Sequence, residues 1–170
     1  MPRLLLSVIT VGSIGLAYYF SMNKNKTISK NGLNLLKQFE GWRSQVYLDS
    51  AGLPTIGYGH LLKPGEFFDI ITKAEGESLL KSDVAEAENA VNDNVNVALT
   101  QNMFDALVSF VYNIGAYNFA SSTLLRVLNE GDYEEARRQL SVWNKVTVNG
   151  VKVVSQGLVN RRQHEQDLFV

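Results

Sequence analysis

One segment, residues 39–62 (FEGWRSQVYLDSAGLPTIGYGHLL), limits the fold more than any other part of the chain. Before it, apolar residues recur at helical spacing over residues 30–40, and Gly41 suits the position just past a helix end. Residues 43–63 then alternate between apolar and polar side chains and carry Gly and Pro at turn positions, which predicts a small antiparallel sheet. The chain must therefore pass from a helix into a sheet within a few residues.

Two carboxylates and a hydroxyl lie around this junction, from Glu40, Asp49 and Thr55. Asp49 follows Glu40 by nine positions, and Thr55 follows Asp49 by six. Glu40 is expected in the last helical turn, where the helix dipole disfavours a negative charge. The neighbouring aromatic residues Phe39 and Trp42 could also shield its carboxyl group from water. Both effects favour the protonated carboxyl, which suits a general acid. Asp49 is expected to stay ionised at a strand end, with the Thr55 hydroxyl placed to hold a water beside it. Two carboxylates facing each other across a cleft are what glycosidic-bond cleavage needs.

Residues around this pair show a family likeness. A Glu at a helix end, followed at these spacings by Asp and Thr and then by a TIG-x-GH-LL run, resembles the catalytic segment of the phage-type lysozymes (endolysins, glycoside hydrolase family 24). Residues 55–62, TIGYGHLL, match that run. Residues 106–119 (ALVSFVYNIGAYNF) and the closing GL-x-x-RR-x-x-E pattern at 157–165 also resemble the family. The resemblance covers residues 30–169.

The resemblance implies hydrolysis of the β-1,4 bond between N-acetylmuramic acid and N-acetylglucosamine in bacterial peptidoglycan, which causes host cell lysis. Glu40 would be the general acid. Asp49 would stabilise the oxocarbenium-like transition state or activate the attacking water, and Thr55 would help to position that water. An inverting outcome is implied, which requires the larger separation of the two carboxyl groups. No metal or cofactor is required.

Further residues acquire expected roles by the same resemblance. Leu61, Tyr112 and Asn113 would bind the glycan, although core packing is an alternative role for Tyr112 and a local helix cap for Asn113. Arg161 would pair with Glu40 across the cleft, with a purely structural ion pair or a surface charge as the alternative. An arginine beside a carboxylate favours its ionised form, which opposes the effect of the helix end on Glu40.

Composition excludes several other classes of function. The net charge of −1 gives no basic field for nucleic acid. The absence of cysteine removes disulfides, thiol catalysis and cysteine-based zinc sites. His60 and His164 are too far apart in sequence to form a metal-site spacing. We therefore expect no metal and no nucleic-acid partner, and we expect a monomer that binds peptidoglycan.

The expected fold is α+β and lysozyme-like, with a small antiparallel β lobe and a larger helical lobe joined by a long helix. Thr72 and Glu75 form a capping-box pattern at the start of that helix, which should extend to about Val91. The Asn149-Gly150 pair, between alternating apolar residues, predicts a hairpin over 146–153. The other expected helices span 100–113, 122–129, 133–144 and the segment from 157 to the C-terminus.

The N-terminal residues 4–22 (LLLSVITVGSIGLAYYFSM) carry no charge, and as a helix they would span about 28 Å, close to the ~30 Å bilayer core. We expect an apolar segment at 1–22 that tethers the chain to the host inner membrane, a linker at 23–29 and a catalytic domain at 30–170. The resemblance suggests the signal-arrest-release kind, in which the segment leaves the membrane uncleaved and the enzyme enters the periplasm. Alternatives are a cleaved signal peptide, with 15–17 as a small-x-small site, a permanent anchor, or a buried helix. The lysines that follow the segment oppose an N-terminus-in orientation.

Two other functions compete with hydrolysis. A lytic transglycosylase uses one acid and no water, so it would leave Asp49 and Thr55 idle and produce anhydro sugar ends. A non-catalytic wall-binding module on the same fold is the alternative from another class, because a fold alone does not guarantee activity.

Overall fold

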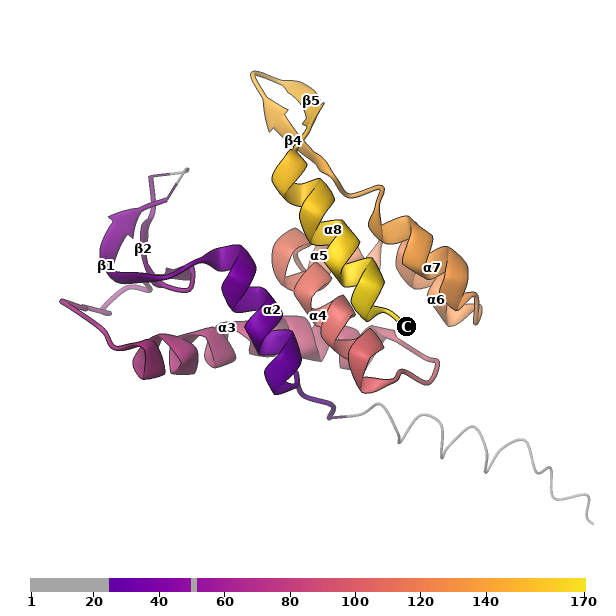
Figure 1. The fold of residues 1–170 in the computed structure, drawn as a ribbon, viewed down its shortest axis with the longest axis horizontal. Helices are drawn as coiled ribbons and strands as arrows, with labels where there is room; N and C mark the ends of the chain where they lie inside the picture. The colour runs from indigo at the N-terminus through magenta and orange to yellow at the C-terminus, as the bar shows by residue number, and fades with distance from the viewer. Residues whose placement is uncertain (1–24, 50–51) are drawn as a thin grey trace, which may run out of the picture.

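The computed structural model describes residues 25–49 and 52–170 (Figure 1). The predicted membrane segment at 4–22, the first residues of the predicted linker and Ser50 in the predicted turn lie outside the described residues. Within the described ranges, no helix is both long enough and apolar enough to cross a membrane.

Helix α2 (Lys30–Glu40) has the bounds that the sequence predicts. Ser29 caps its start, with the Oγ atom accepting hydrogen bonds from the backbone N–H groups of Asn31 and Gly32 at 3.1 and 3.3 Å. Gly41 ends it at φ 71°, a backbone conformation that residues other than glycine rarely adopt. This glycine is what lets the chain leave the helix directly after Glu40.

The β lobe is the predicted antiparallel sheet, in the order β1 (Arg43–Leu48), β2 (Pro54–Gly57) and β3 (His60–Leu61). Its register pairs Tyr47 with Thr55 and Thr55 with Leu61. Residues directly opposite each other in a sheet point to the same face, so these three side chains form one row across the lobe.

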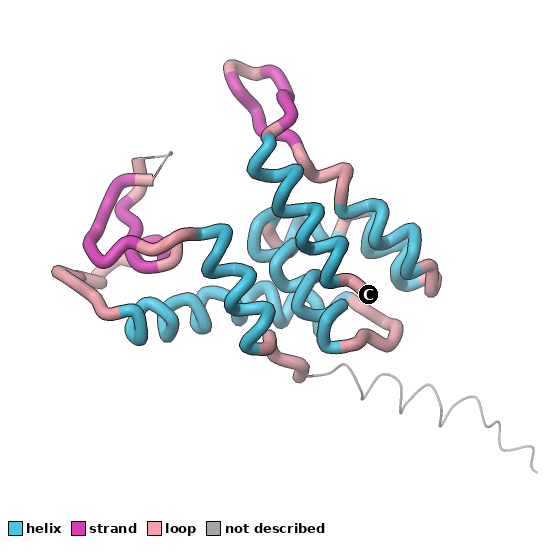
Figure 2. Tube along the Cα trace, in the orientation of Figure 1, coloured by secondary structure: helices cyan, strands magenta, loops and turns pink. Residues whose placement is uncertain are grey.

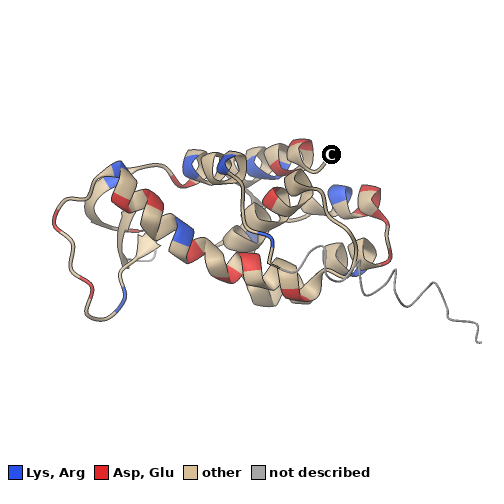
Figure 3. Ribbon diagram, turned by 90° about the horizontal axis from the view of Figure 1, so that it is seen from below, with Lys and Arg blue, Asp and Glu red and all other residues tan. Residues whose placement is uncertain are grey.

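Helix α3 (Lys73–Asn94) joins the two lobes, as Figures 1 and 2 show. The Thr72–Glu75 capping box is present, and the helix extends three residues beyond the predicted end at Val91. One face of α3 is buried through Leu80, Val84 and Val91. Acidic residues are spaced along the rest of the helix, which runs out of the β lobe in Figure 3, and Glu75 and Glu86 among them are exposed.

The helical lobe is built around α4 (Gln101–Ile114), in which every residue from Phe104 to Val111 is buried. Burying a large apolar side chain contributes about 1.5–3 kcal/mol, so α4 supplies much of the core. Thr100 caps its start and Gly115 ends it, both as predicted. The elements that surround it are α5 (Ala116–Ala120), α6 (Thr123–Asn129), α7 (Tyr133–Leu140) and α8 (Gln156–Leu168).

Two details of this lobe differ from the prediction. Helix α5 was not predicted, because it is a single short turn after Gly115 without a side-chain cap. Helix α7 ends at Leu140 and not at Asn144. The chain tightens there into a turn, in which the N–H of Trp143 donates to the carbonyl of Leu140 at 3.1 Å. The carbonyl of Asn144 then accepts from the N–H of Ser155 at 2.9 Å and closes the base of the following hairpin.

That hairpin consists of β4 (Lys145–Val148) and β5 (Val151–Val154), and it projects beyond the start of α8 in Figure 1. Asn149 and Gly150 form the predicted turn, with φ angles of 51° and 79°. Positive φ at both central residues is what a tight hairpin turn of this kind requires.

Residues 26–29, before α2, lie against the helical lobe. Gly32 allows this approach, because a Cβ atom there would lie 2.6 Å from a side-chain carbon of Ile28 and 2.8 Å from Asp105 Cγ. The buried Asp105 carboxylate accepts hydrogen bonds from both the backbone N–H and the hydroxyl of Ser29. Further hydrogen bonds run from Ile28 N to Glu88, from Asn92 to the Lys26 carbonyl and from Gln101 to the Thr27 carbonyl.

Candidate active site

Glu40, the last residue of α2, stands where the helix meets the β lobe, and about a quarter of its side chain (23%) is exposed. Its Oε1 atom accepts a hydrogen bond from Arg161 Nη1 at 2.9 Å, so the predicted Glu40–Arg161 ion pair is present. Its Oε2 atom faces the turn between β2 and β3, where a Cβ atom at Gly59 would lie 3.5 Å away. Glycine at φ 85° therefore keeps the space beside Oε2 free of a side chain.

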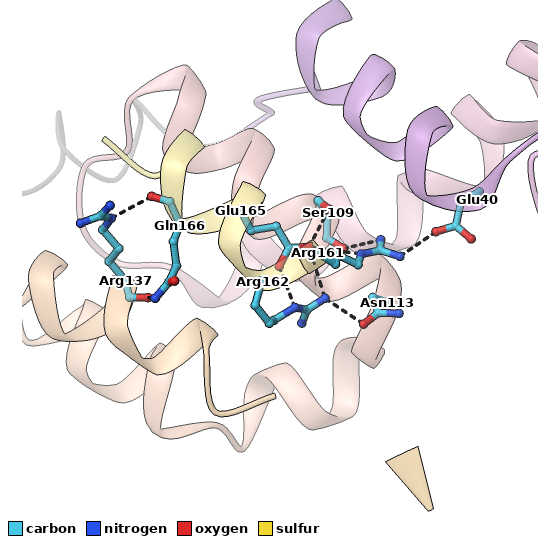
Figure 4. A network of polar contacts seen from close by, with 8 residues as sticks. All are labelled: Glu40, Ser109, Asn113, Arg137, Arg161, Arg162, Glu165 and Gln166. Carbon is cyan, nitrogen blue, oxygen red and sulfur yellow. Dashed lines mark hydrogen bonds and ion pairs between the residues drawn. The ribbon is translucent and has the colours of Figure 1, made fainter. Parts of the chain in front are cut away.

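Arg161, near the middle of α8, is buried and held on several sides (Figure 4). Its Nη2 atom donates to the Ser109 carbonyl at 3.1 Å, and its Nε atom donates to Glu165 Oε1 at 3.3 Å. Its guanidinium also lies over the Phe39 ring, 4.9 Å from the centroid. With one nitrogen on each partner, the guanidinium has a single orientation, and the oxygen of Glu40 that it binds is fixed.

Glu165 lies at the centre of this network and is fully buried. Its carboxylate accepts from Ser109 Oγ at 2.7 Å and forms ion pairs with Arg161 at 3.3 Å and with Arg162 at 3.0 Å. Burial raises the pKa of the Glu165 carboxyl, although Arg162 and Arg161 act in the opposite direction. Two buried cations thus share one buried anion.

Arg162 extends the network to Asn113. Its Nη2 atom donates to Asn113 Oδ1 at 2.8 Å, and its guanidinium stacks over Phe110 at 4.8 Å. Burial lowers the pKa of Arg162 to about 10, in spite of the attraction of Glu165. Asn113, at the end of α4, is therefore oriented by the Arg162 side chain. Its amide group belongs to the same network of hydrogen bonds and ion pairs that holds Glu40 (Figure 4).

Thr55 and Leu61 share one face of the β lobe, and Asp49 lies in the turn that follows β1. Thr55 pairs with Tyr47 and with Leu61, so these three side chains point to one face of the sheet. Asp49 Oδ1 accepts from the N–H of Leu53 at 2.8 Å, which fixes the carboxylate on its turn. Thr55 is buried and donates its hydroxyl to the Leu53 carbonyl at 3.0 Å.

Tyr112 lies near Glu40. Burial, followed by the negative charges of Glu40 and Asp83, raises the pKa of the Tyr112 phenol, while Arg161 opposes the shift. The phenol therefore stays protonated and neutral at physiological pH. The partly buried ring of Tyr112 also packs against the core, the alternative role expected for it.

His60 has a role that the sequence reasoning missed. Its Nδ1 atom lies 2.8 Å from Asp83 Oδ2 on α3, and its Nε2 atom lies 2.9 Å from Glu66 Oε2 in the following loop. Burial by itself lowers the pKa of His60, but hydrogen bonds to Glu66 and Asp83 outweigh burial and raise this pKa above its ordinary value. The protonated ring donates to both carboxylates and ties the β lobe to the long helix.

Sequence reasoning also missed Ser109 and Glu165 as members of the network around Arg161. The signal for Glu165 was available, because Arg161 and Arg162 precede it by four and three positions, the spacing of helical ion pairs. No comparable signal exists for Ser109, which comes from another helix. Within the described ranges, no group of three His, Cys, Asp or Glu side chains is arranged to hold a metal ion.

Comparisons of the sequence and of the structure with known proteins agree with each other. The family model described as phage lysozyme matches residues 37–165. The endolysin of Acyrthosiphon pisum secondary endosymbiont phage 1 is 44% identical over 84% of this chain and 97% of its own length. A SAR-endolysin of bacteriophage PS119 is 40% identical over 76% of this chain and 75% of its own. The solved structure of an endolysin from Escherichia coli O157:H7 phage FAHEc1 superimposes with a TM-score of 0.81 and 42% identity, covering 86% of this chain and 94% of that one.

Proposed function

The chain belongs to the phage lysozyme family, and from this membership we propose that Glu40, Asp49 and Thr55 carry out the hydrolysis of peptidoglycan. As a muramidase it cleaves the β-1,4 bond between N-acetylmuramic acid and N-acetylglucosamine, and as an endolysin it lyses the host cell. The observation that carries the assignment of the acid is the position of Glu40, held at 2.9 Å by Arg161 and facing a glycine turn.

The two oxygens of Glu40 have different tasks in this proposal. Oε1 is bound by Arg161, which holds the carboxyl in place. Oε2 faces the Gly59 turn, where no side chain fills the space, and it carries the proton that is given to the leaving glycosidic oxygen. The proton transfer leaves a carboxylate that Arg161 stabilises at once, because the guanidinium is already in contact.

Asp49 and Thr55 act from the β lobe. Asp49 stabilises the positive charge that develops on the sugar or activates the attacking water. Thr55 uses its hydroxyl hydrogen on the Leu53 carbonyl, so its oxygen is left to accept a hydrogen bond from that water. Leu61 shares a sheet face with Thr55, while Tyr112 and Asn113 stand on the helical lobe; we assign all three to glycan binding.

Substitution of the two acids tests this mechanism. Glu40→Gln removes the transferable proton and should lower the rate of cell-wall lysis by roughly 10²–10⁴-fold, the usual contribution of general acid catalysis. Asp49→Asn should also lose most of the activity. Turbidity of purified cell walls reports the rate, and Glu134→Gln, at an exposed position of α7, is the matched control.

Two outcomes would contradict the mechanism. Near wild-type lysis by Glu40→Gln would show that Glu40 is not the acid. Products that end in anhydro sugars, with Asp49→Asn fully active, would assign the chain to the lytic transglycosylases. The anomeric configuration of the first product distinguishes inversion from retention.

For localisation, we propose that residues 4–22 hold the enzyme at the host inner membrane until it is released into the periplasm. The support is the uncharged 19-residue stretch, diluted by Gly and Ser, and the likeness to SAR-endolysins such as that of bacteriophage PS119. Replacing Gly12, Ser13 and Gly15 with Leu adds apolar transfer energy and should trap the enzyme in the membrane and delay lysis. A mature protein that begins near Tyr18 would identify a cleaved signal peptide and refute the proposal.

A further inference from the structure

The proposed acid has a neighbour that opposes its task. Arg161 donates to Glu40 Oε1 at 2.9 Å, and a cation in contact with a carboxyl group favours the ionised form. A general acid must instead hold its proton at the pH at which the enzyme works. Another group is therefore needed to offset the positive charge of Arg161.

Arg161 has a second anionic partner within the described part of the chain. Glu165 Oε1 lies 3.3 Å from Arg161 Nε, whereas Glu40 is bound by Nη1, so the two carboxylates use different nitrogens of one guanidinium. The third nitrogen, Nη2, donates to the neutral carbonyl of Ser109. The charge of Arg161 is therefore shared between the partly exposed Glu40 and the fully buried Glu165.

The polar groups that contact Glu165 are donors. Its Oε1 atom accepts from Ser109 Oγ at 2.7 Å and from Arg162 Nη2 at 3.3 Å, and its Oε2 atom lies 3.0 Å from Arg162 Nε. A protonated carboxyl would need an acceptor for its own hydrogen, and it would leave two buried guanidiniums without their shared anion. Burial raises the pKa of Glu165, but these donors keep the carboxyl ionised.

The charges of this group can be counted. Arg161, Arg162 and Glu165 are two cations and one anion, so they present a single net positive charge beside Glu40. Without the charge of Glu165, the same site would present two. Because Glu165 is buried, water screens this difference little. At the effective dielectric constant of a protein site, one such charge moves a neighbouring protonation equilibrium by roughly one pH unit.

We propose that Glu165 is a positioning residue for the proposed acid: its buried charge offsets that of Arg161, so Glu40 is oriented by the guanidinium and still keeps its proton. The inference rests on the proposed function, because it takes Glu40 as the acid. Glu165 acts through Arg161, which lies between it and Glu40 (Figure 4).

Within the described residues, the other ionisable groups that face this network are neutral, exposed or paired. Tyr112 of α4 is neutral, because burial raises the pKa of its phenol. His164 and Asp167 of α8 are exposed, so water and salt screen their charges. Substitutions at positions 162 and 165 leave all of these groups in place. The paired groups, with their partners in parentheses, are Lys37 of α2 (Glu77), Asp105 of α4 (Ser29), Arg137 of α7 (the Gln166 carbonyl), Asp49 of the β lobe (the Leu53 N–H) and His60 of the β lobe (Asp83 and Glu66).

The pH–rate profile of cell-wall lysis by the full-length chain tests the proposal. In Glu165→Gln, the uncompensated charge of Arg161 should favour loss of the Glu40 proton at lower pH. We expect the alkaline limb to move down by roughly one pH unit, which lowers the rate there by up to about tenfold, while the acidic plateau falls by less than about threefold. The control Glu130→Gln removes the same charge from the exposed Arg126–Glu130 pair and should leave the profile in place.

A second pair of variants separates the effect of charge from the effect of folding. Arg162→Met removes one cation and should move the alkaline limb up by roughly one pH unit. Adding Glu165→Gln to it restores the single net positive charge beside Glu40, so the limb should return to within about 0.3 pH units of the wild type. This pair measures the charge of Glu165 even if Glu165→Gln alone does not fold. Each rate is divided by the folded fraction from circular dichroism.

Two results would overturn the inference. One is a Glu165→Gln profile that is lowered equally at every pH, which would assign Glu165 to structure alone. The other is an alkaline limb that does not move when Glu165→Gln is added to Arg162→Met. Both leave the proposed function standing as long as Glu40→Gln is inactive. Lysis by Glu40→Gln at the wild-type rate would instead overturn the proposed function.

Discussion

The buried position of Glu165 leads to a quantitative prediction for Glu165→Gln. The substitution keeps the size of the side chain and removes its charge, which leaves the guanidiniums of Arg161 and Arg162 without their shared anion. Removing one partner of a buried ion pair costs about 3–5 kcal/mol. The Gln side chain retains an oxygen that can accept from Ser109, and Arg161 keeps Glu40, so we expect the lower end, about 3 kcal/mol.

The chain provides a control with the same chemistry at the surface. Arg126 and Glu130 have the same i,i+4 spacing as Arg161 and Glu165, and their N–O distance is 2.9 Å, but their side chains are 62% and 58% exposed. Glu130→Gln should therefore cost at most about 0.5 kcal/mol. The two substitutions are chemically identical, so the difference between them measures the effect of burial.

Urea denaturation of the two variants and the wild type measures the free energies of unfolding. For a domain of this size, a loss of about 3 kcal/mol corresponds to a fall in Tm of roughly 6–12 °C. Equal costs for Glu165→Gln and Glu130→Gln, within about 0.5 kcal/mol, would refute the reasoning, because the buried anion would then have no special role.

Gly76→Ala should destabilise the protein by about 1–3 kcal/mol, because its Cβ would lie 2.3 Å from Trp42 Cζ3. The helical control Gly157→Ala, with no contact closer than 3.8 Å, should be neutral or stabilising by up to about 1 kcal/mol in the same denaturation assay. His60→Asn should reduce the free energy of unfolding most at acidic pH: the raised pKa of His60 means that its stabilisation is complete below about 6.5 and is lost as the pH rises through the folded-state value. Unfolding curves at several pH values check this, and a wild-type–variant difference that does not shrink with rising pH would contradict it.

Local signals in the sequence were enough to predict most of the secondary structure. The end of α2 at Gly41, the capping box at Thr72 and the Asn149-Gly150 turn were all predicted from single residues whose backbone or capping preference is strong. The lysozyme-like architecture followed from the resemblance of residues 55–62 and 157–165. Where such signals were weak, the prediction failed, as at α5 and at the end of α7.

The candidate site was likewise predictable from the sequence only in part. Its proposed acid, Glu40, was chosen from its expected place at a helix end, and the resemblance added the ion-pair partner Arg161, which the structure shows at 2.9 Å. Only the tertiary structure joined Glu165 to Ser109 and His60 to Asp83, because these partners lie 56 and 23 residues apart in the chain. Their contacts depend on how α8 packs on α4 and how the β lobe sits on α3. The sequence by itself therefore determined the local elements, through short-range backbone and capping preferences, and it pointed to the proposed reacting groups. The orientation of those groups was decided by long-range packing, which brings buried charges together only when the whole domain is folded.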